Sequence, residues 1–316
     1  MSGIMNNYFY GKAGKADYTP ENLPSNRVAL FFEMLRLRLT SMVGMNLVCI
    51  LTALPIILWT YMNIQVLLIE LGISETGAIA AEVAADATNI IRGRLTAYFV
   101  FLIPCLMFYQ VFHTGVMYIL RNWARDQHTF TFSDFKDALK ENWKGGLLLG
   151  FLNGVSLLLA YIGYVYYGQM SLTSGAFWAV PQTLVIIFTA LWWMANMLIT
   201  PMMVTYNMKF TTLLRNSFIM IFARLPMSLL IWGVSVAIPV CAVLLPIPYI
   251  LPITGILYIL IGLALVYFVY VSYANSCFDR YLNPRIEGAQ VNMGLRDRSF
   301  DEEDDIEVTE EDIKNL

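Results

Sequence analysis

Long stretches without any charged residue alternate with short polar segments along this chain of 316 residues. Four such stretches consist mostly of Leu, Ile, Val, Met, Phe and Tyr: Leu39–Ile69, Leu95–Leu120, Gly145–Met208 and Leu225–Phe278. A helix needs about 20 apolar residues to cross a bilayer, so the first two stretches predict one span each and the last two predict a pair each. The pattern therefore predicts an all-α membrane protein with six transmembrane helices. The expected spans are 41–64, 96–119, 146–167, 180–203, 227–245 and 253–275.

A shorter pattern, Phe-x-x-x-Leu followed by Lys or Arg, precedes the first, third and fifth spans, beginning at Phe31, Phe135 and Phe210. The Phe and the Leu are i, i+4 neighbours on one helical face, with a cation beside them. Such segments are typical of amphipathic helices that lie among lipid headgroups. We therefore expect three helical hairpins, each preceded by a cytoplasmic amphipathic helix. A true triplication and a chance recurrence in so apolar a sequence both stay open.

Composition and charge agree with a membrane location and give an orientation. The charged fraction is 14% and the mean hydropathy is +0.60, whereas soluble domains contain about 25% charged residues. All but two of the Lys and Arg residues fall on one side of the predicted spans, and Arg92 and Arg94 fall on the other. The positive-inside rule makes the richer side cytoplasmic. We expect a multi-pass protein of the plasma membrane with both termini in the cytoplasm.

The polar ends of the chain define the predicted domain organisation. Residues 1–26 form a polar N-terminal segment without the apolar core of a signal peptide, so the first span is expected to act as its own insertion signal. The membrane domain is expected over 27–280. Residues 281–316 contain nine Asp and Glu residues between positions 301 and 312, and this composition predicts a disordered acidic cytoplasmic tail.

Polar residues within the spans are the first candidate site. None of them is an Asp, Glu, Lys or Arg, and this absence argues against a charge-coupled transporter. The uncharged polar residues at related depths form a candidate intramembrane layer: Asn46, Gln110, His113, Asn153 and Asn196. The layer either lines a cavity that is open to the cytoplasm or supplies interhelical hydrogen bonds, which contribute about 0.6 kcal/mol each.

The second candidate site is a cationic and aromatic face on the cytoplasmic side, where a partner protein or membrane lipids could bind. It comprises Arg121, Trp123, Arg125, Lys136, Lys140, Trp143 and Lys144. A third pattern, Gly146-x-x-x-Gly150-x-x-x-Gly154, suits close helix contact, either within the chain or between subunits.

Sequence motifs for catalysis are missing. There is no Walker A, GxSxG, HExxH or GxGxxG motif, and the four cysteines and two histidines are not spaced as a metal site. We therefore expect no enzymatic activity, no cofactor, no metal and no nucleic-acid partner.

Several segments resemble one family of bacterial membrane proteins. They are Tyr8–Pro20, Phe31–Leu35, Thr114–Asp126 and Phe132–Lys144, and together they are similar to the YesL-like family, whose function is unknown. The resemblance covers most of residues 8–280 and implies a Gram-positive-type cytoplasmic membrane and an association with carbohydrate uptake. It supplies no catalytic residues. The cytoplasmic connections also lack the Glu-Ala-Ala…Gly coupling loop of sugar permeases, which argues against a permease subunit.

Two functional hypotheses follow. The first is an accessory or regulatory partner of a carbohydrate-uptake or sensing system, which would bind a transporter subunit or a sensor protein through its cytoplasmic helices. The alternative is a facilitated carrier or channel for a neutral sugar-like solute. Assembly with further copies of the chain stays open.

Overall fold

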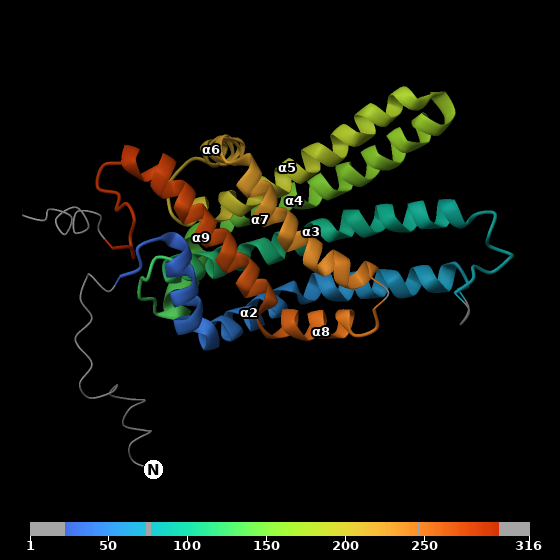
Figure 1. Cartoon of the computed structure of the whole chain (residues 1–316). Coiled ribbons are helices and arrows are strands. Elements are labelled where there is room, and N and C mark those ends of the chain that lie inside the picture. The colour runs from blue at the N-terminus through green and yellow to red at the C-terminus, as the bar shows by residue number, and fades with distance from the viewer. Residues whose placement is uncertain (1–22, 74–76, 246, 297–316) are drawn as a thin grey trace, which may run out of the picture.

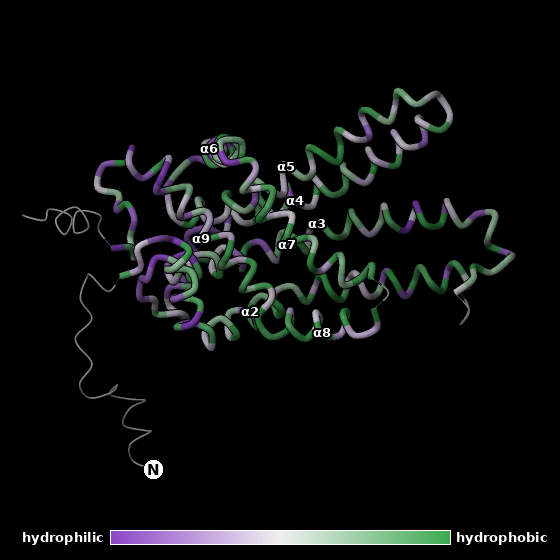
Figure 2. The backbone as a smooth tube through the Cα atoms, in the orientation of Figure 1, coloured by the Kyte–Doolittle hydropathy of each residue, from purple (hydrophilic) through white to green (hydrophobic). Residues whose placement is uncertain are grey.

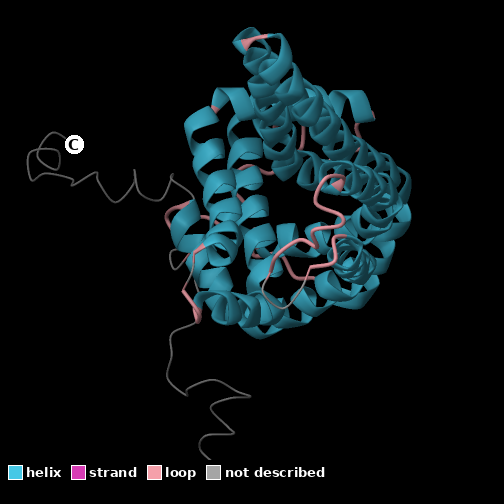
Figure 3. Cartoon of the chain, turned by 90° about the vertical axis from the view of Figure 1, so that its right-hand side faces the viewer, coloured by secondary structure: helices cyan, strands magenta, loops and turns pink. Residues whose placement is uncertain are grey.

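The computed structural model describes residues 23–73, 77–245 and 247–296, and in this part of the chain the secondary structure is helical (Figures 1 and 3). Six helical segments there are long and apolar enough to cross a membrane, which confirms the predicted all-α membrane class. The helices are α2 (Arg27–Glu70), α3 (Ala87–Trp123), α4 (Thr131–Ser174), η2 (Ala176–Trp178), α5 (Ala179–Met203), α6 (Phe210–Ala223), α7 (Leu225–Leu244), α8 (Ile250–Leu257), the π-helical turn η3 (Tyr258–Gly262), α9 (Leu263–Tyr281) and η4 (Asn283–Arg285).

Local chemistry explains where several of these helices begin and end. Asn26 caps α2, because its side-chain oxygen accepts a hydrogen bond from the Ala29 N–H at 2.9 Å. The same helix stops before Gly72, which has a φ of +55° that favours glycine. At the start of α4 the Asp134 carboxylate accepts a hydrogen bond from the Phe130 N–H at 2.9 Å, which is half of a capping box.

The helices pack as a bundle with a polar and an apolar region. Figure 1 shows α4 and α5 running side by side, with their far ends diverging from those of α2 and α3. Hydropathy along the chain is highest in the middle of the long helices, and hydrophilic residues gather where α3 ends and α4 begins (Figure 2). We call this end of the molecule the α3–α4 end. Large apolar side chains such as Leu172, Phe188 and Ile259 are exposed along the outside of the helices, as lipid contact requires.

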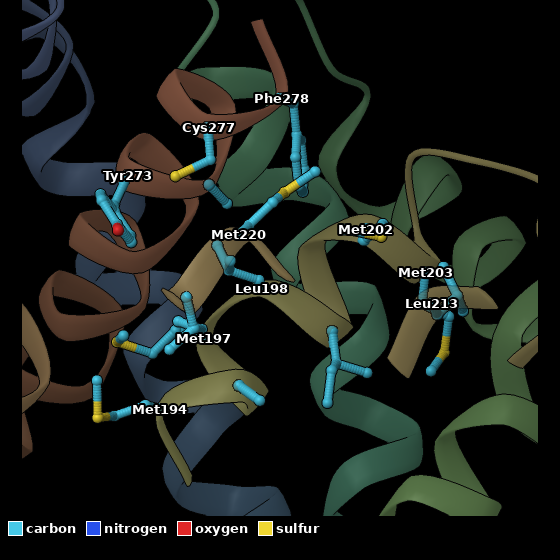
Figure 4. Close-up of a cluster of buried hydrophobic side chains, with 14 of the residues drawn as sticks. Met194, Met197, Leu198, Met202, Met203, Leu213, Met220, Tyr273, Cys277 and Phe278 are labelled. Atoms are coloured by element: carbon cyan, nitrogen blue, oxygen red, sulfur yellow. The ribbon is translucent and has the colours of Figure 1, made fainter. Parts of the chain in front are cut away.

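Two clusters of buried apolar side chains form the core. One joins α2, α3 and α9 and includes Trp123 and Phe268, and the other surrounds α5 where it meets α6 and α9. The second cluster is rich in methionine (Figure 4). Its buried methionines are Met194, Met197, Met202, Met203 and Met220. Because α9 contributes to both clusters, it connects the two halves of the bundle.

The glycine pattern forms a contact within the chain. A Cβ atom on Gly150 would lie 2.6 Å from the Met107 Cα, and one on Gly154 would lie 2.8 Å from the Ile103 Cα. A Cβ atom on Gly146 would lie 3.0 Å from the Val111 Cα. These distances leave no room for a side chain, so the three glycines let the backbones of α3 and α4 touch. We call this contact the glycine seam.

The predicted amphipathic segments differ in how they join the spans. Residues 27–40 and 131–145 are the first turns of the continuous helices α2 and α4, whereas Phe210–Ala223 is the separate helix α6. Of the predicted acidic tail, residues 281–296 lie in the described part and include η4, and the acidic positions 301–312 lie outside it, as do residues 1–22. The hairpin arrangement, the domain boundaries and the disorder of the tail stay predictions.

Candidate functional site

A cavity of about 270 Å³ lies between α3, α4, α5, α7 and α9, and most of the predicted polar layer lines it. Gln110, His113, Asn153 and Asn196 contribute to its wall. Ligand pockets in proteins usually measure about 300–1,000 Å³, so this cavity of about 270 Å³ lies just below that range and has room only for a small solute. None of the described residues that line it is charged, so this part of the wall carries no fixed charge to attract an ion.

Most polar groups of this wall already have a protein partner. The Gln110 side-chain amide donates to the Thr200 hydroxyl at 3.0 Å. The Asn153 side-chain oxygen accepts from the Trp192 indole N–H at 2.9 Å. Asn196 donates to the Trp192 carbonyl in its own helix at 2.9 Å. These bonds fix the orientation of the amides and join α3 to α5 and α4 to α5.

His113 is different, because its ring nitrogens are buried and have no hydrogen-bond partner among the described residues. Its ring stacks on Tyr109 with centroids 5.5 Å apart and lies 4.4 Å from the Tyr267 centroid. The Tyr109 and Tyr267 hydroxyls are hydrogen-bonded to each other. Trp193, another lining residue, also has a buried indole nitrogen without a partner in the described part of the chain. Buried polar groups are normally paired, so these atoms are unsatisfied groups in two residues of the cavity wall.

Asn46, the remaining member of the predicted layer, does not line the cavity. It is fully buried and faces η3, where it donates to the carbonyls of Tyr258 at 2.9 Å and Ile259 at 2.7 Å and accepts from the Ala264 N–H at 3.0 Å. Asn46 therefore bonds to two carbonyls of the π-helical turn and to one N–H of the first turn of α9. Since Tyr258 lines the cavity, Asn46 supports the wall from behind.

Sequence reasoning did not identify the aromatic part of the wall. Tyr109, Tyr258, Tyr267, Tyr270 and Trp232 line the cavity together with the polar layer. One signal was available in the sequence, because Tyr109 and His113 are four residues apart and Tyr267 and Tyr270 are three apart, spacings that place each pair on one helical face.

The predicted cationic face divides into a buried and an exposed part. Trp123 is 1% exposed and donates to the Thr129 hydroxyl at 2.8 Å, and Arg125 is 8% exposed. Arg121 is half-buried. In contrast, the side chains on the first turns of α4 are exposed: Lys136, Lys140, Trp143 and Lys144. The structure therefore leaves only this second group as a continuous surface.

The buried part belongs to a polar cluster at the α3–α4 end. Arg27 forms an ion pair with Asp279, and Asp279 also accepts from the Asn283 amide at 2.6 Å. Tyr206, between α5 and α6, donates to the Asn283 side-chain carbonyl. Burial raises the pKa of Tyr206 to about 12, against the opposite effect of the positive charges of Arg125 and Arg121. The Tyr206 phenol is therefore neutral at pH 7.

Comparison with known proteins finds that part of the chain is similar to an uncharacterised family. Residues 91–164 match DUF624, described as a protein of unknown function. The match covers α3 from its second turn and α4 up to Tyr164, and so contains the glycine seam and the lining residues Gln110, His113 and Asn153. No curated protein matches the chain, and no solved structure matches it. The match supports an uncharacterised-domain family, and the narrower YesL-like resemblance stays a prediction.

Proposed function

We propose that this membrane protein binds a small neutral solute in the cavity and acts as its facilitated carrier. The observation that carries the proposal is His113, a residue of the cavity wall whose two buried ring nitrogens have no partner in the described chain. A neutral imidazole offers one donor and one acceptor, and the Trp193 indole offers a second donor. Hydroxyl groups both donate and accept, so a hydroxylated solute matches this set.

The aromatic lining supports the same class of solute. Tyr109, Tyr267 and Trp232 line the cavity, and aromatic side chains suit the apolar C–H faces of a ring-shaped polyol. Carboxylates and ammonium groups would lack a counter-charge in this wall. We therefore infer a neutral, sugar-like or polyol-like ligand of monosaccharide size.

The test is solute flux in proteoliposomes that contain the purified full-length protein. A panel of labelled neutral monosaccharides and polyols should include a substrate, and His113→Leu should reduce its flux at least tenfold. His128→Leu is the matched control, because His128 is exposed and does not line the cavity. If no member of the panel crosses the membrane, or if both variants behave alike, the carrier proposal is wrong.

A second candidate function, the accessory partner, is favoured by the exposed start of α4. Phe132 is 82% exposed and lies one turn before the exposed Lys136, with the exposed Lys140 and Lys144 in the following turns, a combination that suits a protein partner or a headgroup layer. Replacing the three lysines with Glu should release a transporter subunit or sensor protein that co-purifies in mild detergent, while Arg36→Glu on α2 should not. A partner retained by the triple variant would contradict this candidate.

We also propose the orientation and arrangement that the sequence predicts: three hairpins with their amphipathic segments in the cytoplasm, both termini cytoplasmic, and a plasma-membrane location. The support is the excess of Lys and Arg on one side of the spans. Reporter fusions after Gly72 and after Asp126 should show opposite sides of the membrane, with Asp126 in the cytoplasm. The same side for both positions would refute the topology.

A further inference from the structure

Three arginines come together at the α3–α4 end from segments that are distant in sequence. Arg27 begins α2, and Arg121 and Arg125 stand about one turn apart where α3 ends. The C-terminal segment after α9 folds back on them: Arg27 donates to the Met293 carbonyl at 3.2 Å, and Arg125 donates to the Gln290 carbonyl at 3.0 Å. The cluster is therefore built into the fold.

The positive charges of this cluster exceed its negative charges. Among the hydrogen bonds that these guanidinium groups make within the described residues, the only carboxylate is that of Asp279, which Arg27 binds. The partners of the other two are neutral: Arg121 donates to the Asn122 side-chain oxygen at 2.6 Å, and Arg125 to a backbone carbonyl. The neighbouring Tyr206 phenol is neutral at pH 7 and supplies no negative charge.

Each of the three guanidinium groups also has one N–H donor that forms no hydrogen bond within the described residues. The Nε atoms of Arg27, Arg121 and Arg125 are buried and have no hydrogen-bond partner among the described residues. Arg125 is only 8% exposed. A buried charge without a counter-charge is costly, and a buried donor without an acceptor adds to that cost.

We propose that Arg121 and Arg125 bind a phosphate group. A guanidinium presents parallel N–H donors that match two phosphate oxygens, and a phosphate carries one to two negative charges, which balances the excess. Arg121 is the half-buried member and gives access to the ligand, whereas Arg125 forms the floor of the site. The phosphate comes either from an anionic lipid headgroup, since basic pockets at helix ends bind such headgroups, or from a free phosphate compound.

Thermal unfolding of the full-length protein tests the proposal and separates the two sources. In one arm inorganic phosphate is added to protein in a neutral detergent, against chloride at equal ionic strength. In the other, phosphatidylglycerol is added to phosphatidylcholine nanodiscs. A ligand at about 100 times its Kd should raise the Tm of the wild type by roughly 5 °C. A rise in the first arm identifies free phosphate, and a rise in the second arm alone identifies the lipid.

The variants Arg121→Gln and Arg125→Gln should lose this rise, whereas Arg36→Gln, which removes an exposed cation of α2, should keep it. Size-exclusion chromatography reports whether each variant folds. If Arg125→Gln does not fold, the Arg121→Gln variant and the wild-type titrations still test whether the cluster binds phosphate. A wild type that responds in neither arm overturns the proposal, as does an Arg121→Gln variant that responds like Arg36→Gln.

Discussion

Two faces of α3 meet their neighbours in opposite ways. On one face, the glycine seam brings the backbone of α4 so close that a Cβ atom on Gly150 would lie 2.6 Å from the Met107 Cα. On another face, Tyr109 and His113 look onto a cavity of about 270 Å³. Because glycines bring the two backbones into direct contact, α3 and α4 form a tightly packed pair. Beside the cavity, in contrast, the His113 ring nitrogens have no partner among the described residues. The comparison teaches that one helix can combine a close backbone contact with α4 on one face and the wall of a cavity on another.

The largest effect is expected from Gly150→Leu. The backbone of α3 cannot move away from a new side chain without separating the helices, so the free energy of unfolding should fall by about 3 kcal/mol or more. Reversible unfolding in mixed micelles measures this change. Gly44→Leu is the control, because a Cβ atom there has nothing within 4 Å. Equal losses in both variants would show that the seam is not the rigid element.

Asn46→Ala should have the next largest effect on stability. The variant removes two hydrogen bonds to η3 and one to the first turn of α9, and at about 0.6 kcal/mol each the loss is about 2 kcal/mol. Asn63→Ala removes one side-chain bond, within α2, and should cost about a third as much in the same assay. Similar costs would mean that Asn46 does not hold the π-helical turn.

Trp192→Phe tests the hydrogen bond that joins α5 to α4 at the edge of the cavity. The variant keeps an aromatic ring but removes the N–H that Asn153 accepts, so we expect a loss of about 0.6 kcal/mol. A double-mutant cycle with Asn153→Ala should recover a coupling energy of that size. Additive effects would show that this bond does not form in the membrane.

His113→Leu should change stability least. Since the ring nitrogens have no partner in the described chain, the substitution breaks no known hydrogen bond, and the change should lie within about 0.5 kcal/mol in the absence of solute. The same variant should lose solute flux, which separates binding from folding. A loss of about 2 kcal/mol or more would assign His113 a structural role and remove the basis of the carrier proposal.

The sequence predicts the membrane class because charge-free runs of more than 20 residues have few other uses in a protein. It also predicts the close contact of Gly146, Gly150 and Gly154, since their spacing puts them on one side of α4. The partner of that contact was open, because a helix face does not reveal which neighbour it meets. The structure assigns it to α3 of the same chain.

The candidate sites were harder to predict, for two physical reasons. Depth in the membrane follows from residue count, but the rotation of a helix does not, so Asn46 at a depth similar to that of His113 faces η3 and not the cavity. Arg125 is buried under the C-terminal segment, where it donates to the carbonyl of Gln290, 165 residues later in the sequence. No short-range sequence pattern predicts a contact between residues so far apart in the chain.

The methionine-rich cluster around α5 affects how easily the packing around this helix can rearrange. Thioether chains are unbranched and polarizable, and they change rotamer while still filling the same volume. Met194, Met197 and Met202 therefore let the packing around α5 adjust at a lower cost than a core of branched side chains would. Because α5 also carries Trp193 and Asn196 in the cavity wall, a small rotation of this helix would change where these polar side chains point.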